Sequence, residues 1–139
     1  MPKHRRIVVG ITGASGFIYG VYALRMLKAL EIETHLIVSK AAQLTRSHET
    51  DFSYKQVAQF ADAVYRPDDI GAPISSGSFK TLGMLVAPCS VRTLSEISSG
   101  VTSSLLSRAA DVCLKERRRV VLMLRETPLH TGHIRSMLA

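Results

Sequence analysis

Four short polar segments of this 139-residue chain each follow a run of apolar residues. They are Thr12–Gly16 after Ile7–Ile11, Ser39-Lys40 after Thr34–Val38, Cys89–Thr93 after Met84–Pro88, and Arg125-Glu126 after Val120–Leu124. Hydroxyl, guanidinium and main-chain N–H groups of this kind bind phosphate. Because ligands of open α/β sheets bind beyond the carboxyl ends of the strands, the position of all four segments at such ends predicts a ligand-binding site there.

The first segment contains the spacing Gly10-x-x-Gly13-x-x-Gly16. It predicts a loop whose backbone approaches a phosphate at the start of a helix, and a tight turn without a ligand is the alternative. The string is also similar to the glycine pattern of NAD-binding short-chain dehydrogenases. However, the second strand ends in Ser39-Lys40 where a ribose-binding Asp or Glu is expected. The chain also has no Tyr-x-x-x-Lys pair to serve as the catalytic dyad of those enzymes.

The third polar segment begins a predicted helix with two hydroxyls and a guanidinium. Ser90, Arg92 and Thr93 could hydrogen-bond a phosphate or the polar edge of a flat ring. The alternative is that Ser90 is a simple N-cap.

A group of cations could hold a second phosphate. Arg108 and Lys115 are seven residues apart and therefore share one face of their helix. With Arg125 and the carboxylate of Glu126 they could clamp a phosphate. The alternative is a solvated basic face, which is the interpretation we favour for Arg117–Arg119.

The remaining reactive side chains give weaker signals. Glu49 and Asp51 follow the second predicted helix, where a carboxylate could relay protons or could simply end or cap a helix. His130-x-x-His133 has a spacing that a metal could use, but no third ligand is evident, so we predict no metal site. The two cysteines form no CxxC pair, which excludes a disulfide framework and a zinc ribbon. We expect Cys89 to be a buried small residue.

The composition excludes several classes of protein. Apolar residues make up 46% of the chain and charged residues 21%, which predicts one globular domain over residues 1–139. The net charge of +7 favours anionic partners, but four Tyr, four Phe and no Trp disfavour a stacking nucleic-acid binder. No apolar run reaches the roughly 18–20 residues that span a bilayer. The basic segment Met1–Arg6 precedes no signal-peptide core, so we expect a cytoplasmic protein.

Strand-like and helix-like segments alternate, which predicts an α/β domain with a mainly parallel sheet. We expect core strands at 7–11, 34–38, 84–88 and 120–124, and a short strand at 63–65. We expect helices at 17–30, from 41, and at 54–61, 90–98, 105–116 and from 130, and a mobile loop at 70–80.

Eight blocks of the chain, in order, resemble the UbiX-type flavin prenyltransferases. They are Gly10–Gly16, His35–Ala42, Glu49–Asp51, Ile74–Phe79, Pro88–Ser90, Arg108–Val112, Leu114–Arg118 and Arg125–Leu129. Related cysteine decarboxylases carry Pro-Ala-Ser-Ala-Asn-Thr where this chain has Pro88-Cys89-Ser90-Val91-Arg92-Thr93. This difference favours the prenyltransferase branch.

The resemblance implies a Rossmann-like (flavodoxin-like) three-layer fold. It also implies an enzyme that transfers a dimethylallyl group from dimethylallyl monophosphate to N5 and C6 of reduced FMN. This reaction would need no metal. The product, prenylated FMN, would serve a UbiD-type decarboxylase. The residues implied to bind FMN are Gly13, Ala14, Ser15, Ser39, Ser90, Val91, Arg92, Thr93 and Arg125. Those implied to surround the prenyl phosphate are Ser76, Gly77, Arg108, Lys115 and Glu126. Ser15, Glu49 and Glu126 are the implied catalytic residues, and Glu49 would help to move protons near the flavin.

The resemblance also bears on assembly and on the end of the chain. It implies a homo-oligomer, usually a dodecamer, with sites built from neighbouring subunits. Family members continue beyond the position of Ala139, so we expect the chain to lack a C-terminal strand and helix that supply a Tyr and a basic residue to the prenyl-phosphate site. The alternatives that remain are an FMN-dependent cysteine-type decarboxylase, a non-catalytic FMN carrier or partner subunit, and, on charge alone, a nucleic-acid-binding module.

Overall fold

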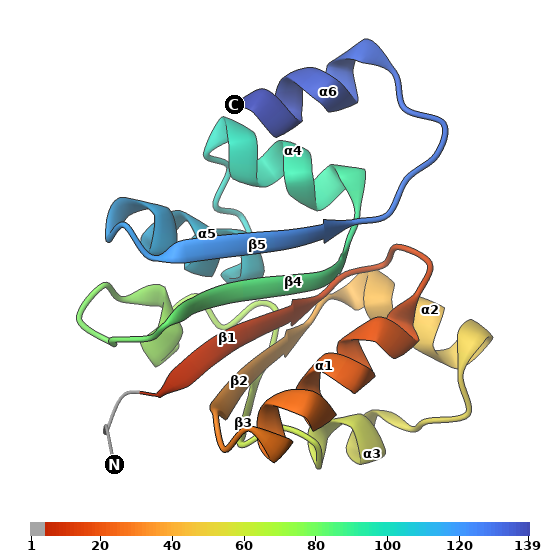
Figure 1. Ribbon diagram of the computed structural model, residues 1–139, viewed down its shortest axis with the longest axis vertical. Helices are drawn as coiled ribbons and strands as arrows, with labels where there is room; N and C mark the ends of the chain where they lie inside the picture. The colour runs from red at the N-terminus through yellow and green to blue at the C-terminus, as the bar shows by residue number, and fades with distance from the viewer. Residues whose placement is uncertain (1–4) are drawn as a thin grey trace.

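Five parallel strands form one sheet in the computed structural model, which describes residues 5–139 (Figure 1). The strands are β1 (Arg6–Ile11), β2 (Glu33–Val38), β3 (Ala63–Tyr65), β4 (Gly83–Cys89) and β5 (Arg119–Leu124), in the spatial order β3-β2-β1-β4-β5. This is the Rossmann order, and the direction of winding reverses between β1 and β4. The predicted fold class is therefore confirmed, and the reversal predicts a ligand crevice at the carboxyl ends of β1 and β4.

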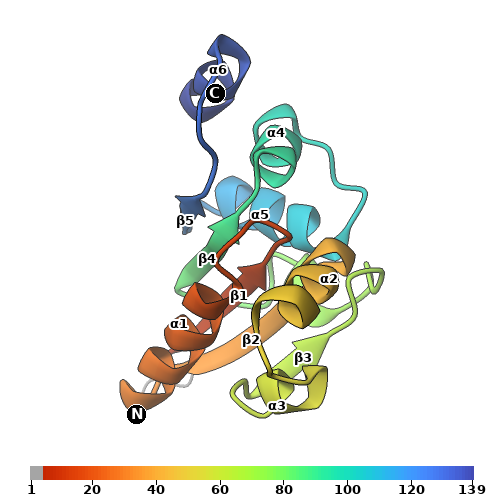
Figure 2. The same cartoon turned by 90° about the vertical axis from the view of Figure 1, so that its right-hand side faces the viewer.

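Helices cover both faces of the sheet, which gives the expected three layers (Figure 2). Side chains of α1 (Phe17–Ala29), α2 (Lys40–Glu49) and α3 (Tyr54–Ala58) join one core cluster. Side chains of η1 (Pro73–Ser75), α4 (Val91–Ser99) and α5 (Leu105–Lys115) join the other. Alternate residues of the central strands supply both clusters, so Val8 faces α5 whereas Val9 faces α1. This explains why these strands are continuous apolar runs in the sequence.

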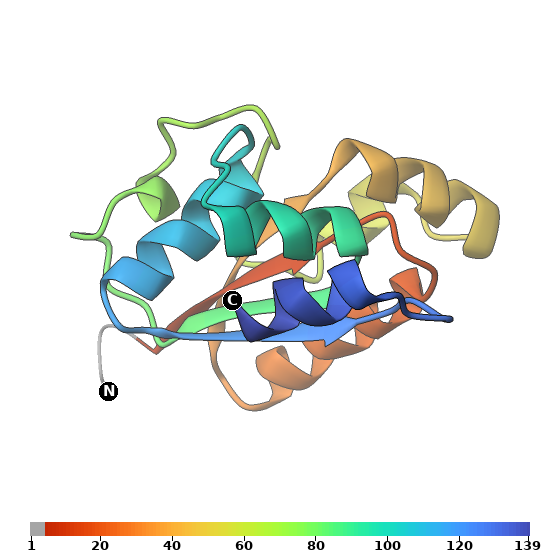
Figure 3. The same ribbon diagram turned by 90° about the horizontal axis from the view of Figure 1, so that it is seen from above.

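The predicted strand at Val120–Leu124 is confirmed, but β5 is an edge strand and only its Val120, Leu122 and Leu124 face packs against the core. It pairs only with β4, and its residues alternate between half-buried and exposed. Val121 and Met123 are 48% and 44% exposed on the face away from α5. The last helix, α6 (Thr131–Leu138), lies against α4 above this edge and has no buried residue (Figure 3).

Most predicted boundaries hold to within one or two residues, with three exceptions. The helix predicted to end at residue 61 ends at Ala58. The second helix runs through Glu49, so this residue ends α2 instead of lying in the following loop. The segment predicted as a mobile loop, 70–80, contains the short helix η1. The basic start of the chain, residues 1–4, lies outside the described residues. No helix between residues 5 and 139 is long and apolar enough to cross a membrane.

Candidate functional site

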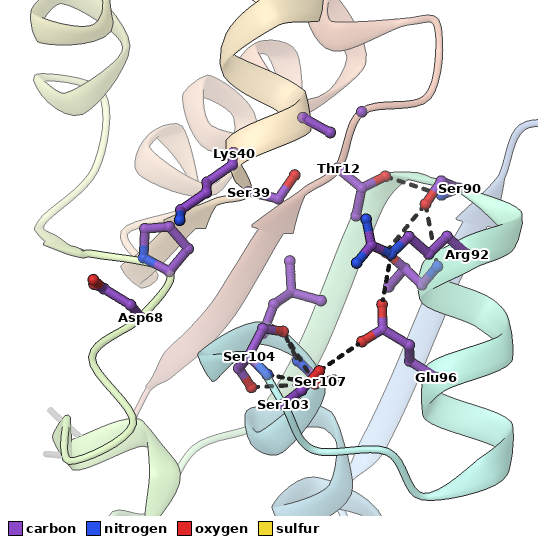
Figure 4. Close-up of a pocket in the computed structure, with 15 residues that line it drawn as sticks. Thr12, Ser39, Lys40, Asp68, Ser90, Arg92, Glu96, Ser103, Ser104 and Ser107 are labelled. Atoms are coloured by element: carbon purple, nitrogen blue, oxygen red, sulfur yellow. Dashed lines mark hydrogen bonds and ion pairs between the residues drawn. The ribbon is translucent and has the colours of Figure 1, made fainter.

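A pocket of about 470 Å³ opens at the carboxyl ends of β1, β2 and β4, where the strand order reverses (Figure 4). Its lining consists of Thr12, Gly13, Ser39, Lys40, Ala41, Pro67, Asp68, Ser90, Arg92, Thr93, Glu96, Ser103, Ser104, Leu106 and Ser107. Hydroxyl groups dominate the polar part of this lining. The volume falls within the range of pockets that hold small molecules and cofactors, about 300–1,000 Å³.

Three helices begin at this pocket, and each has a serine as its N-cap. Ser39 accepts a hydrogen bond from Ala42 N–H at 3.1 Å at the start of α2. Ser90 accepts from Thr93 N–H at 3.2 Å at the start of α4, and Ser104 accepts from Ser107 N–H at 3.2 Å at the start of α5. The first N–H groups of each helix have no partner within the helix, and the helix dipole is positive at this end. The convergence of three such ends makes the pocket suited to an anion.

Charged side chains stand on both sides of the pocket. Arg92 Nε lies 3.5 Å from Glu96 Oε1, and Ser103 donates a hydrogen bond to the same carboxylate at 3.3 Å. Lys40 and Asp68 lie across the pocket from this pair (Figure 4). The Arg92 side chain is 86% exposed, so it is free to turn toward a ligand phosphate.

Thr12 joins the two strands that border the crevice. Its hydroxyl donates to the carbonyl of Pro88 at 2.7 Å and accepts from the N–H of Ser90 at 2.9 Å, and the residue is 1% exposed. This buried threonine therefore fixes the end of β1 relative to the start of α4. Thr12 was predicted only as the first residue of the polar segment Thr12–Gly16, and this bridging role of its hydroxyl was not predicted.

The glycine segment contributes Gly13 to the pocket, but the N-terminus of α1 that follows it is capped by a side chain of the protein. A Cβ at Gly13 would lie 2.6 Å from the Cβ of Ala41, so this glycine allows α2 to approach. Gly16 has φ of 104°, which other residues rarely adopt. The N–H groups of Gly16 and Phe17 donate to the Glu49 carboxylate at 2.9 and 3.2 Å. A protein carboxylate therefore already occupies the anion position at this helix end.

Glu49 forms one polar group with Ser15 and Arg125 at the rim of the sheet. Ser15 Oγ donates to Glu49 Oε2 at 2.7 Å. The hydrogen bonds from Gly16 N–H and Ser15, assisted by the charge of nearby Arg125, lower the pKa of the Glu49 carboxyl. Glu49 is therefore held as a carboxylate that orients the Ser15 hydroxyl. Glu126 follows Arg125 and accepts a hydrogen bond from Thr127 N–H at 3.2 Å.

The structure brings part of the predicted flavin-binding set together. Gly13, Ser39, Ser90, Arg92 and Thr93 line the pocket. The others belong to the same loops or to the end of β5 but are not among its lining residues, namely Ala14, Ser15, Val91 and Arg125. The lining also includes five residues that were not predicted as site residues, namely Asp68, Glu96, Ser103, Ser104 and Ser107. The serine pair before α5 was the available signal for Ser103 and Ser104.

The predicted cluster of Arg108, Lys115, Arg125 and Glu126 does not form within one chain. Lys115 ends α5 just before β5 begins, whereas Arg125 follows the last residue of β5. A six-residue strand separates these two ends by roughly 20 Å. Lys115 Nζ instead lies 3.8 Å from Asp111 of the same helix. Lys115 and Arg125 therefore lie at opposite ends of β5.

The remaining predicted groups have structural roles. Arg118 does not lie on a solvated face as predicted, because its guanidinium donates to the carbonyls of Gly77 and Phe79.

The rings of His130 and His133 stack with centroids 3.5 Å apart at the start of α6. Between residues 5 and 139, no group of three or more His, Cys, Asp or Glu side chains could hold a metal ion. Cys89 is buried as predicted, and burial raises the pKa of its thiol to about 12.

Comparison with known proteins identifies close relatives. The family model described as Flavoprotein matches residues 1–134. The flavin prenyltransferase UbiX of Neisseria meningitidis serogroup B is 56% identical over 133 residues, which are 96% of this chain and 70% of that protein.

Two solved structures have nearly the same fold. The crystal structure of AnUbiX (PadA1) in complex with FMN and dimethylallyl pyrophosphate superposes with a TM-score of 0.96 at 51% identity, over 98% of this chain and 72% of that one. The dodecameric FMN-dependent UbiX-like decarboxylase from Escherichia coli O157:H7 superposes with a TM-score of 0.94 at 48% identity, over 96% and 72%.

Proposed function

The chain belongs to the UbiX family of flavin prenyltransferases, and on that premise we propose that it transfers a dimethylallyl group from dimethylallyl phosphate to N5 and C6 of reduced FMN. The single observation that carries the proposal is the pocket at the strand-order reversal, where α2, α4 and α5 all begin. One similar structure holds FMN together with dimethylallyl pyrophosphate, and another is that of an FMN-dependent protein.

The residues of the pocket fit FMN. Its phosphate is a dianion, and the N-terminal turns of the three helices with Arg92 would offset that charge. Leu106 and Pro67 supply apolar surface for part of a flat ring. The residues that would hold FMN are Gly13, Ala14, Ser15, Ser39, Ser90, Val91, Arg92, Thr93 and Arg125. Reduced FMN, when bound, supplies the electron-rich atoms that accept the dimethylallyl group.

We assign the proton-handling role to the Glu49, Ser15 and Glu126 side chains. The hydrogen bond from Ser15 to the Glu49 carboxylate directs the serine hydroxyl and leaves its oxygen lone pairs available to a flavin proton. Glu49 itself is a poor proton donor, because its pKa is lowered. Glu126 is exposed beside Arg125 and has the freedom to exchange protons with solvent.

Ser76, Gly77, Arg108 and Lys115 would hold the prenyl phosphate. Arg108 and Lys115 carry the positive charge that stabilises negative charge developing on the leaving phosphate. Both residues lie on α5. Lys115 is beside the start of β5, whereas Arg125 and Glu126 follow the end of that strand. We therefore propose a homo-oligomer in which one copy supplies the α5 residues and a neighbouring copy supplies the flavin and Glu126. The dodecameric relative supports such an arrangement.

Three further assignments complete the proposal. The donor is dimethylallyl monophosphate, with the pyrophosphate as the competing candidate raised by the relative's bound ligand. The product, prenylated FMN, is passed to a UbiD-type decarboxylase. The reaction uses no metal, because cationic side chains take the place that a metal would have at the leaving phosphate.

The test is mass spectrometry of the flavin after an anaerobic reaction. Protein loaded with FMN is reduced, given dimethylallyl monophosphate or pyrophosphate, and denatured to release the flavin. A gain of one C5 unit, with reductant and donor both required, supports the proposal and identifies the donor.

Other outcomes separate the alternatives. Bound but unmodified FMN would favour a carrier subunit, and carbon dioxide released from a cysteine-containing peptide would favour a cysteine-type decarboxylase. Absence of flavin binding together with salt-sensitive duplex binding would favour a nucleic-acid-binding module.

A further inference from the structure

Arg118 holds a loop by its main chain. Its Nη2 donates to the carbonyl of Gly77 at 2.6 Å, and its Nη1 donates to the carbonyl of Phe79 at 3.1 Å. The rigid fork of the guanidinium suits two acceptors in one plane. A single side chain thus joins the residue before β5 to a segment about forty residues earlier in the chain.

The turn after α5 fixes where Arg118 can reach. Arg117 has φ of 57°, and the N–H of Arg118 donates to the carbonyl of Cys113 at 2.7 Å. This left-handed turn ends the helix and reverses the chain into β5. Arg118 is half-buried, whereas its neighbours Arg117 and Arg119 are exposed.

A second arginine holds the far end of the same loop. Arg6 of β1 donates from Nε to the carbonyl of Lys80 at 2.7 Å. Its guanidinium carbon lies 3.6 Å from the centroid of the Phe79 ring, and the edge of that ring meets His35. The loop formed by Ser76–Lys80 is therefore anchored at both ends to sheet or helix termini.

The anchored loop lies next to the basic end of α5. A Cβ at Gly77 would collide with the Glu116 carboxylate, and Glu116 directly follows Lys115. The hydroxyl groups of Ser76 and Ser78 are 2.9 Å apart at the exposed side of the loop. Ser76 and Gly77 thus lie near the end of α5 that carries Lys115.

We propose that Arg118 is a positioning residue for the prenyl donor. It holds Ser76 and Gly77 beside Lys115, and its own donors are used by the two carbonyls instead of by the donor phosphate. The inference rests on the proposed function, in which Ser76, Gly77 and Lys115 bind that phosphate. Loss of the two hydrogen bonds frees the loop and weakens donor binding, while the flavin pocket stays intact.

The test compares Arg118→Gln with Arg119→Gln in the prenyl transfer assay. Both variants remove one positive charge from the same end of the molecule, but only the first removes the loop contacts. The two hydrogen bonds act on the donor only through the position of the loop, so the expected effect is a roughly tenfold rise in KM for dimethylallyl monophosphate. We expect this rise in Arg118→Gln, with kcat and FMN affinity within about twofold of the wild type. Arg118→Lys, which can reach one carbonyl, should recover part of the affinity.

Amide hydrogen exchange of residues 77–80 in the unliganded protein gives a readout independent of activity. Faster exchange in Arg118→Gln but not in Arg119→Gln supports the anchoring. An equal rise in KM in both variants would assign the effect to net charge, and an unchanged KM in Arg118→Gln would remove the positioning role. A fall in kcat and FMN affinity with unchanged KM would make the role purely structural. Wild-type protein that transfers no prenyl group overturns the proposed function itself, whereas the exchange rates still decide whether Arg118 anchors the loop.

Discussion

Removal of the Glu49 carboxylate should destabilise the protein in a way that depends on pH. The carboxylate accepts hydrogen bonds from Ser15, Gly16 and Phe17 at 2.7, 2.9 and 3.2 Å and so serves as the cap of α1. A lost cap with its favourable charge costs about 1 kcal/mol at an exposed site. For a chain of this length, we expect the Tm of Glu49→Ala to be about 4 °C lower at pH 7.

The pH dependence follows from the lowered pKa of Glu49. The unfolded chain binds the proton more tightly than the folded protein, so the stabilisation is fully present above the unfolded pKa, about 4.3. It is lost as the pH falls through the still lower folded pKa. The difference in Tm between Glu49→Ala and wild type should therefore be constant from pH 7 to about pH 5 and shrink below about pH 4.

The assay is differential scanning fluorimetry without FMN, so that altered ligand binding does not contribute to the Tm. Asp51→Ala is the matched control, because this exposed carboxylate lies two residues away and does not cap α1. Equal Tm shifts in the two variants, or a Glu49→Ala shift that persists unchanged at pH 3, would refute the capping role.

Three other predictions follow from particular side chains. Ser90→Ala removes the N-cap of α4 beside the pocket, so fluorescence titration should show roughly tenfold weaker FMN binding, whereas Ser98→Ala at the end of the same helix should not. Burial raises the pKa of Cys89 to about 12 and also raises that of Cys113. Both thiols should therefore react quickly with Ellman's reagent at pH 8 only after the protein is unfolded. A thiol that reacts quickly in the folded protein would contradict this prediction. His35→Ala removes a buried ring that hydrogen-bonds Tyr65 and Glu33 and packs against Phe79, so urea unfolding should show a loss of about 2–3 kcal/mol with unchanged FMN affinity.

The strands and helices could be predicted because local patterns specify them. A strand buried on both faces must be a short run of apolar, β-branched residues, and Ile7–Ile11 is such a run. Ser39, Ser90 and Ser104 cap helices through bonds that span three residues. Such signals need no knowledge of the rest of the fold. The place of the site was predictable for a similar reason, since parallel strands bring their carboxyl ends to one edge.

The cap of α1 could not be predicted from the glycine segment, because the residue that provides it is distant in the chain. Three hydrogen-bond donors at the start of α1 face a carboxylate that is 32 to 34 residues away. A free helix N-terminus and one occupied by Glu49 have the same local sequence. Only the packing of α2 beside α1 brings the Glu49 carboxylate to this helix end.

The sequence by itself determined the elements, the parallel α/β class and the family resemblance, because each depends on residues close together in the chain or on blocks in a fixed order. The tertiary structure alone decided which charges meet. It placed Lys115 and Arg125 at opposite ends of β5, put β5 at an edge of the sheet where its outer face is exposed, and turned Arg118 back onto the loop before β4. These outcomes depend on strand order and on which ends of each strand and helix lie together, and neither is encoded in the spacing of the residues that carry the charge.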